Sequence, residues 1–114
     1  MNNIFISSSV KENIKDTVEL ANKLNVNIEI CKFADPLILD GNLENVIEEF
    51  FQAFQGFNGR LSLHGAFFDL TPSSKDPRIV DITTYRYTQS FNIAKKLNVN
   101  TVVFHTGYNG LVKF

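Results

Sequence analysis

The chain has 114 residues, of which 44% are apolar and 20% charged, so it is long enough for one domain with a hydrophobic core. Its net charge of −1 offers no broad basic field for nucleic acid or an acidic membrane surface. The single cysteine, Cys31, excludes an internal disulfide framework, and no apolar run approaches the length of a membrane helix. We therefore expect a single cytoplasmic domain over residues 1–114, with no membrane contact.

Strand-like and helix-like segments alternate along the chain. The strand-like segments are residues 4–9, 27–33, 60–65 and 101–105. Ser9 and Glu12 form a capping-box pattern for the first helix, and Asp76 followed by Pro77 is typical of the start of the third. The apolar helix faces are Ile14, Val18, Ala21 and Leu24; Leu43, Ile47, Phe50 and Phe54; and Tyr87, Phe91, Ala94 and Leu97. The order βαβαβαβ predicts parallel strands joined by crossover helices.

An internal repeat supports this order. ANKLNVNIEICKF from Ala21 closely matches AKKLNVNTVVFHT from Ala94, and Asn25 and Asn98 suit the left-handed conformation that closes a helix. The repeating unit occupies roughly 36 residues, so eight units would need roughly 290, within the range of a (β/α)8 barrel. We therefore expect an α/β fold equal to about half of a TIM barrel. A flavodoxin-like open sheet also fits the order, although SSSVKEN stands where a glycine-rich phosphate loop would follow the first strand.

Alternation along the strands predicts one apolar face, toward the helices, and one polar face. Strand residues point to opposite faces in turn. The residues expected on the polar face are Glu29, Cys31, Ser62, His64 and His105. Glu29 would orient a ligand, act as an acid or base, or pair with a neighbour, because a buried carboxylate needs a partner. Cys31 would be either a small core residue or a nucleophile.

The chain has only two histidines, His64 and His105, and each comes at the end of a predicted strand. Adjacent parallel strands lie about 4.8 Å apart, and barrels of this type build their sites at the carboxyl ends of the strands. Two neighbouring imidazoles can bind one divalent ion. The pair therefore predicts a metal or substrate site, whereas either histidine alone would more simply be a hydrogen-bonded core or loop residue.

Two stretches around these histidines, LSLHGAFFDLTPSSKDPRI and TVVFHTGY, resemble the xylose isomerase-like barrels. This superfamily includes sugar phosphate isomerases and epimerases and the endonuclease IV enzymes, and IEICKFAD and LDGNLENVIEEF are similar to the sugar branch. In the endonuclease branch, histidines that end strands three and four bind zinc, and the matching positions are His64 and His105. The resemblance implies a divalent cofactor (zinc, manganese or cobalt) and a sugar or sugar phosphate ligand. We assign Glu29, Ser62 and Phe68 to the substrate site.

The resemblance also implies what this chain lacks. In the sugar branch the main metal ligands and two catalytic glutamates come from later strands, where the glutamates move a proton next to a carbonyl. Residues 1–114 do not include those strands, so we assign no catalytic residue and expect little or no turnover by this chain alone. Ala66 and Thr106 stand where the family often has proline, which affects the loops beside both histidines.

The expected function is thus that of a metal-dependent sugar or sugar phosphate isomerase or epimerase, present as an N-terminal half-barrel. One alternative is an endonuclease IV-like enzyme of abasic-site DNA repair, against which the near-neutral charge weighs. The other is a non-catalytic half-barrel that binds or assembles. Because unpaired parallel edge strands promote association, we also expect a homo-oligomer formed through the open sheet edges.

Overall fold

The computed structural model describes residues 3–8 and 13–107. The strands are β1 (Phe5–Ser8), β2 (Asn27–Ile30), β3 (Leu61–His64) and β4 (Val102–Val103). The α-helices are α1 (Ile14–Leu24), α2 (Pro36–Leu39), α3 (Leu43–Ala53) and α4 (Pro77–Lys96), and the 3₁₀ turns are η1 (Lys32–Ala34) and η2 (Phe54–Gly56).

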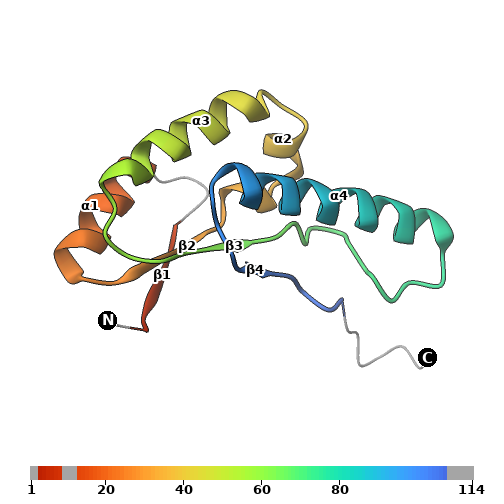
Figure 1. Cartoon of the computed structure of the whole chain (residues 1–114). Coiled ribbons are helices and arrows are strands. Elements are labelled where there is room, and N and C mark those ends of the chain that lie inside the picture. The colour runs from red at the N-terminus through yellow and green to blue at the C-terminus, as the bar shows by residue number, and fades with distance from the viewer. Residues whose placement is uncertain (1–2, 9–12, 108–114) are drawn as a thin grey trace.

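The four strands form one parallel sheet in the order β1-β2-β3-β4, which confirms the predicted βαβαβαβ unit. The described helices all lie on one side of this sheet, above it in Figure 1. A doubly wound sheet reverses its strand order and carries helices on both faces. The described strands show no such reversal, so the flavodoxin-like alternative does not hold for them.

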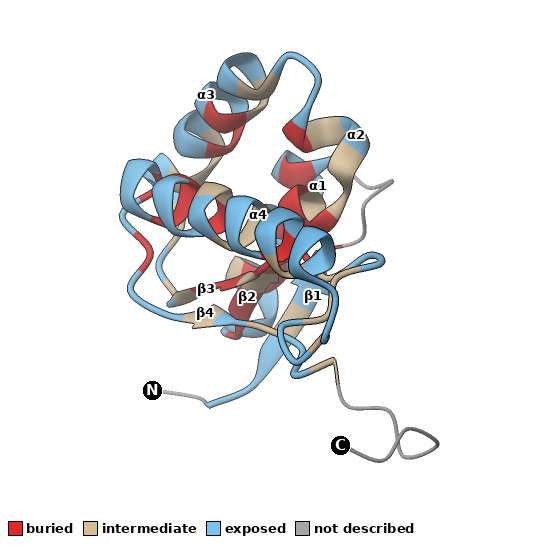
Figure 2. Ribbon diagram, turned by 90° about the vertical axis from the view of Figure 1, so that its right-hand side faces the viewer, coloured by how far each residue is buried: buried red, intermediate tan, exposed pale blue. Residues whose placement is uncertain are grey.

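The core lies between the helices and the face of the sheet turned toward them. Ile28, Ile30 and Leu63 are fully buried, and Figure 2 shows the buried residues concentrated on β2, β3 and the helix surfaces that face them. Phe33, in the turn after β2, packs edge-on against Phe50 of α3 with ring centroids 5.1 Å apart. The sheet is therefore covered on one face only, and its other face is left for polar side chains.

The repeat forms the same backbone structure twice. Asn25 and Asn98 have φ angles of 55° and 57°, in the left-handed region. The next residue closes the helix in both copies: the Val26 N–H donates to the Ala21 carbonyl at 3.0 Å, and the Val99 N–H to that of Ala94 at 2.8 Å. This is the hydrogen bond of a Schellman-type helix end, so the prediction from the Lys-Leu-Asn repeat is confirmed.

The structure corrects the predicted start of the first helix. Helix α1 begins at Ile14 and is capped by Asn13, whose side chain accepts a hydrogen bond from the Lys15 N–H at 2.9 Å. Ser9 and Glu12, the predicted capping box, lie outside the described residues. The cap predicted for the third helix is confirmed, because Asp76 accepts from the Arg78 N–H at 3.0 Å and Pro77 is the first helical residue.

Strands β2 and β4 end two or three residues earlier than the sequence predicted. The backbone leaves β2 after Ile30 and forms η1 and α2, neither of which was predicted; Asp35 caps α2 by accepting from the Leu37 N–H. Strand β4 ends at Val103, so His105 lies beyond it.

The prediction that Phe91 belongs to the buried face of its helix is wrong. Its side chain is 51% exposed, and its ring packs edge-on against that of Phe104, with ring centroids 5.3 Å apart. Helix α4 instead buries Thr83, Ser90, Ile93 and Ala94. No helix among the described residues combines the length and apolar character needed to cross a membrane.

Candidate metal centre

The open face of the sheet carries Glu29, Ser62 and His64, three of the five polar residues that the strand alternation assigned to it; Cys31 and His105 lie just beyond their strands. On β2, Ile28 and Ile30 are fully buried toward the helices, whereas Glu29 between them is half-buried. Glu29 is in register with Ser62 of β3, and neighbours in register in a parallel sheet share a face. His64 follows Ser62 by two residues and so lies on the same face, one row nearer the carboxyl edge.

Glu29 is paired with its neighbours in the sheet. The Ser7 hydroxyl of β1 donates to Glu29 Oε1 at 3.2 Å, and Cys31 Sγ lies 3.5 Å from the same oxygen. Burial raises the pKa of the Cys31 thiol and the negative charge of Glu29 raises it further, while hydrogen bonding with Ser7 acts in the opposite direction. A raised pKa keeps the thiol protonated near neutral pH, so this environment does not activate Cys31 as a nucleophile.

The two histidines meet at the carboxyl edge of the sheet. His64 is the last residue of β3, His105 follows β4 by two residues, and their Nε2 atoms lie 3.1 Å apart. The ring centroids are 4.9 Å apart and the ring planes cross at 66°. The structure thus brings together the two residues that the sequence singled out, although they are 41 positions apart in the chain.

A backbone contact sets the tautomer of His64. Its Nδ1 lies 2.8 Å from the Gly65 carbonyl oxygen. A carbonyl oxygen only accepts hydrogen bonds, so Nδ1 carries the proton, and in the neutral ring Nε2 presents a lone pair toward His105. With that tautomer, the contact is a hydrogen bond from the Nε2–H of His105 to His64. Binding of one ion by both rings would require His105 to carry its proton on Nδ1 as well, which leaves both Nε2 lone pairs free.

The spacing of the two nitrogens fits shared coordination of one ion. Two nitrogens bound to a tetrahedral zinc ion at about 2.0–2.1 Å are separated by about 3.3 Å. The observed 3.1 Å is close to that value, so an ion could bind both nitrogens if the rings turned to aim both Nε2 atoms at a point beside the line that joins them. Within residues 3–8 and 13–107, no group of three or more His, Cys, Asp and Glu side chains is placed to hold a metal. The described residues therefore bring together two candidate ligands, the imidazoles of His64 and His105.

Phenylalanine rings surround the histidine pair on one side. Phe67 stacks on the ring of His105 with centroids 4.4 Å apart and an interplanar angle of 25°, and its centroid is 4.8 Å from that of His64. Phe68 stacks on Phe67 at 4.3 Å and is itself 47% exposed. Phe67 was not among the residues predicted for the site, and its only sequence signal was its place in the His-Gly-x-Phe pattern.

The residues assigned to the substrate site differ in how accessible they are. Phe68 presents an exposed ring next to Phe67, and Glu29 is half-buried on the open face. Ser62 is only 7% exposed, so it has little surface to offer a ligand in this chain. The structure therefore places Phe68 against Phe67, the ring that contacts both histidines, and Glu29 with Ser62 one row below the histidine pair.

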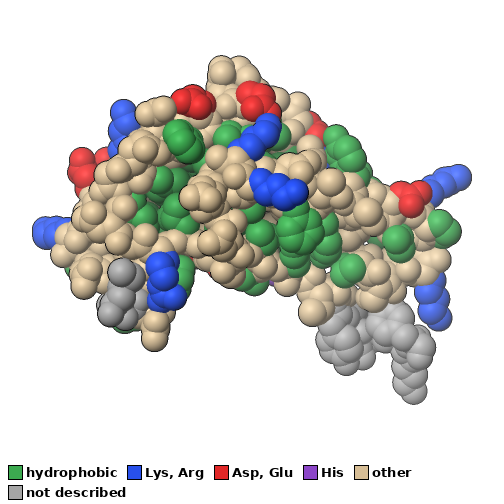
Figure 3. Space-filling view, in the orientation of Figure 1, with side chains coloured by type: hydrophobic (Ala, Val, Ile, Leu, Met, Phe, Trp, Pro, Cys, Tyr) green, Lys and Arg blue, Asp and Glu red, His purple; other side chains and the backbone are tan. Residues whose placement is uncertain are grey.

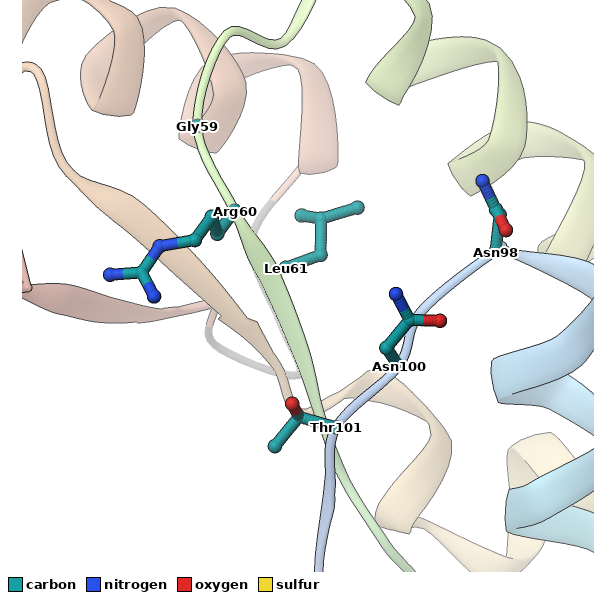
Figure 4. Close-up of a pocket in the computed structure, with 6 residues that line it drawn as sticks. All are labelled: Gly59, Arg60, Leu61, Asn98, Asn100 and Thr101. Atoms are coloured by element: carbon teal, nitrogen blue, oxygen red, sulfur yellow. The ribbon is translucent and has the colours of Figure 1, made fainter. Parts of the chain in front are cut away.

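A cavity of about 390 Å³ lies at the other end of the sheet, where β3 and β4 begin. Figure 4 shows Asn98 and Asn100 on the segment that leads into β4, with Leu61 directed toward that segment and Arg60 directed away. The Arg60 guanidinium donates to Asn3 Oδ1 at 2.8 Å and lies over the Phe5 ring. The cavity and the histidine pair are thus separate features at opposite ends of the strands.

Charged side chains are mixed in sign on the face shown in Figure 3, where basic groups are scattered rather than gathered in one patch.

One ion pair is well defined: Arg86 of α4 makes a bidentate contact with Asp40, with both N–O distances at 2.7 Å. This pair ties α4 to the end of α2.

Comparison with known proteins supports the fold. No protein-family model matches the chain, and no curated protein matches it. A solved structure of the TTHB071 protein from Thermus thermophilus, described as soaked with ZnCl2, superposes with a TM-score of 0.68 and 23% sequence identity. The match covers 93% of this chain and 39% of the TTHB071 chain, so this chain spans less than half the length of that protein.

Proposed function

We propose that this chain supplies a two-histidine half-site for a divalent transition metal ion, His64 and His105 being its ligands. The observation that carries the proposal is the 3.1 Å separation of the two Nε2 atoms at the carboxyl edge of a singly wound parallel sheet. Sites in barrels built from such sheets lie at that edge. The contact between His64 Nδ1 and the Gly65 carbonyl supports the same role, because metal-bound imidazoles commonly donate their other N–H to such an acceptor.

Zinc is the first metal to test, with manganese and cobalt next. Imidazole nitrogen suits zinc and other first-row metals, and the structurally similar TTHB071 protein is described as soaked with ZnCl2. Cys31 is a free thiol whose raised pKa disfavours the thiolate form that binds metals, so we do not include it among the ligands. A free thiol also fits a reducing compartment, and we propose the cytoplasm as the location.

The reaction class we propose is sugar or sugar phosphate isomerisation or epimerisation, on the xylose isomerase-like resemblance of the sequence. A bound metal would polarise sugar oxygens. The exposed Phe68 ring would pack against the apolar C–H face of the sugar. The Glu29 carboxylate would accept hydrogen bonds from the sugar hydroxyls. The catalytic glutamates of the sugar branch belong to later strands, so we expect binding without turnover by residues 1–114 alone.

We also propose that the chain associates through its open sheet edges. In the described sheet β1 and β4 are each paired on one side only. Large apolar side chains are exposed on α1 and α4: Leu20 and Leu24 are 49% and 53% exposed, and Phe91 is 51% exposed. Pairing β4 of one copy with β1 of another would cover these side chains. A monodisperse monomer in sedimentation at micromolar concentration would contradict this part of the proposal.

The metal site is tested by calorimetric titration of zinc, manganese and cobalt into the wild-type chain and the His64→Ala/His105→Ala variant. The chain has only two histidines, so this variant contains no imidazole. We expect one ion per chain in the wild type, a loss of more than about tenfold in affinity in each single variant, and no specific binding in the double variant. Cys31→Ser is the matched control and should bind as the wild type does.

Two results would remove the proposal: no binding of any of the three metals by the wild type, or unchanged binding by the double variant. The reaction class is tested separately in a complete barrel by comparing ketose interconversion with cleavage of abasic DNA. Cleavage without sugar conversion would favour the DNA-repair alternative.

A further inference from the structure

Contacts from outside the sheet hold His105 in place. The last hydrogen bond between β3 and the following strand runs from the Gly65 N–H to the Val103 carbonyl, at 2.8 Å. Strand β4 ends at that residue, and His105 is exposed. A residue two positions beyond the strand would ordinarily be free to change its backbone direction, yet the His105 ring lies against His64. Contacts outside the sheet must therefore direct it.

The first such contact comes from helix α4. The Tyr87 hydroxyl donates a hydrogen bond to the His105 carbonyl oxygen at 3.0 Å. The Tyr87 ring also stacks on Phe104, with centroids 4.1 Å apart and an interplanar angle of 30°. Burial raises the pKa of the Tyr87 phenol, so the group remains a neutral O–H donor near neutral pH. Tyr87 of helix α4 thus contacts two consecutive residues, the ring of Phe104 and the backbone carbonyl of His105.

The second contact comes from the loop after β3. Phe67 lies nearly parallel to the His105 ring at 4.4 Å, and Phe68 stacks on Phe67 and supports it at 4.3 Å. A parallel stack restricts rotation of the imidazole about its χ2 angle, because other rotations would bring the ring edge into Phe67. Phe67 therefore defines the plane in which His105 Nε2 points toward His64.

We propose that Tyr87 and Phe67 are positioning residues for His105: Tyr87 directs its backbone, and Phe67 sets the plane of its ring opposite His64. This inference rests on the proposed metal site for its functional meaning, while the positioning itself is measurable without metal. The Tyr87 hydroxyl bonds the His105 carbonyl, and Phe67 has no atom that could bind a metal. Both act through His105.

The hydroxyl contact is tested with Tyr87→Phe, which removes one oxygen and keeps the ring on Phe104. Tyr85→Phe is the matched control, because Tyr85 lies on the same helix, is 55% exposed and has no described hydrogen bond through its hydroxyl within residues 3–8 and 13–107. The imidazole signals of both histidines are measured by NMR without metal, and zinc affinity is measured by calorimetry. We expect Tyr87→Phe to shift the His105 signals and to weaken zinc binding by about 2- to 12-fold, the equivalent of one neutral hydrogen bond.

The ring contact is tested with Phe67→Leu, with Phe68→Leu as its control. Stacking on Phe67 places the His105 ring protons above an aromatic face, so they should resonate upfield in the wild type and return downfield in Phe67→Leu. Phe68→Leu keeps the ring that touches His105 and should change these shifts little. Circular dichroism and thermal unfolding of each variant check that the fold is retained.

The two proposals fail in different ways. Unchanged His105 signals and zinc affinity in both Tyr87→Phe and Phe67→Leu would overturn the positioning inference and leave the metal site standing. A wild-type chain that binds no zinc would overturn the metal site, whereas the metal-free NMR shifts would still decide whether Tyr87 and Phe67 position His105.

Discussion

The ring of Phe104 occupies the space in which a β-carbon of residue 65 would lie: a Cβ built on Gly65 would stand 2.3 Å from Phe104 Cε1. Glycine at this position therefore lets the segment after β4 lie directly against the end of β3. Since Gly65 follows His64 and Phe104 precedes His105, this close approach also brings the two histidines together.

We accordingly expect Gly65→Ala to disturb both stability and the histidine pair. The Phe104 ring is flanked by Tyr87 and Phe91, so the added methyl group would displace this ring from its contacts or move the chain that carries His105. Overpacking of this kind costs about 1–3 kcal/mol of unfolding free energy, measurable by urea denaturation. The imidazole signals of both histidines should shift in the same variant.

Gly56→Ala is the control for this prediction. A β-carbon on Gly56 meets no atom within 4 Å, so its free energy of unfolding should be unchanged or raised by up to about 1 kcal/mol. Equal stability of the two alanine variants would show that the segment around Phe104 is not packed against Gly65 in solution.

A second prediction concerns Asn27, which joins three strands near their amino ends. Its buried carboxamide donates to the Ile4 carbonyl at 3.1 Å and accepts the Arg60 N–H at 2.7 Å. Asn27→Ala leaves the Arg60 N–H without this acceptor, so we expect a loss of about 1–3 kcal/mol in urea denaturation.

Asn100→Ala provides the matched control, because Asn100 holds the equivalent position in the second copy of the repeat but is exposed beside the cavity shown in Figure 4. Its effect should remain within about 0.5 kcal/mol. A loss in Asn100→Ala as large as that in Asn27→Ala would mean that Asn100 is also buried in solution, as it would be if another strand covered β4.

The third prediction concerns the reactivity of Cys31. Burial raises the pKa of this thiol, Glu29 raises it further, and Ser7 lowers it. Only the thiolate reacts with iodoacetamide, so at pH 8 the folded chain should be alkylated more slowly than the chain unfolded in urea.

Two variants of the neighbours should shift the rate of Cys31 alkylation in opposite directions. Glu29→Gln removes a negative charge that disfavours the thiolate and should speed alkylation. Ser7→Ala removes a hydrogen bond that favours it and should slow alkylation. If both variants changed the rate in the same direction, the described contacts of Cys31 would not explain its reactivity.

The fourth prediction concerns the pH dependence of stability through Asp40 and Arg86. The hydrogen bond from Arg86 lowers the pKa of the Asp40 carboxyl in the folded chain. A group whose pKa is lowered by folding stabilises the folded state above its unfolded pKa, and this contribution is lost as the pH falls through the folded pKa.

Asp40→Asn should therefore lower the melting temperature at pH 7, and the difference from the wild type should shrink as the pH falls below about 4. Asp81→Asn, a substitution at an exposed position of α4, is the control and should show a smaller difference at pH 7. A difference for Asp40→Asn that grew on acidification would contradict the assigned pairing.

The local features of the fold were readable in the sequence. Helix ends at Asn25 and Asn98, the start of α4 at Asp76 and the alternation of burial on β2 all follow from side chains within a few residues of each other. The pairing of His64 with His105 was also predictable, since His64 ends β3 and His105 follows β4, the adjacent parallel strand, by two residues. Turn η1 was missed because a strand-like run of residues continues into it. Helix α2 was missed although Asp35 and Pro36 form the same cap pattern as Asp76 and Pro77.

The sequence by itself determined the order of parallel strands and which face of the sheet is polar, because periodicity and caps act over one or two turns of the chain. Tertiary structure alone decided that Phe67 stacks on His105, that Tyr87 holds its carbonyl and that Phe91 stays exposed. These contacts join segments separated by many residues, and their geometry depends on the path of the loop after β3 and the placement of α4 across the sheet.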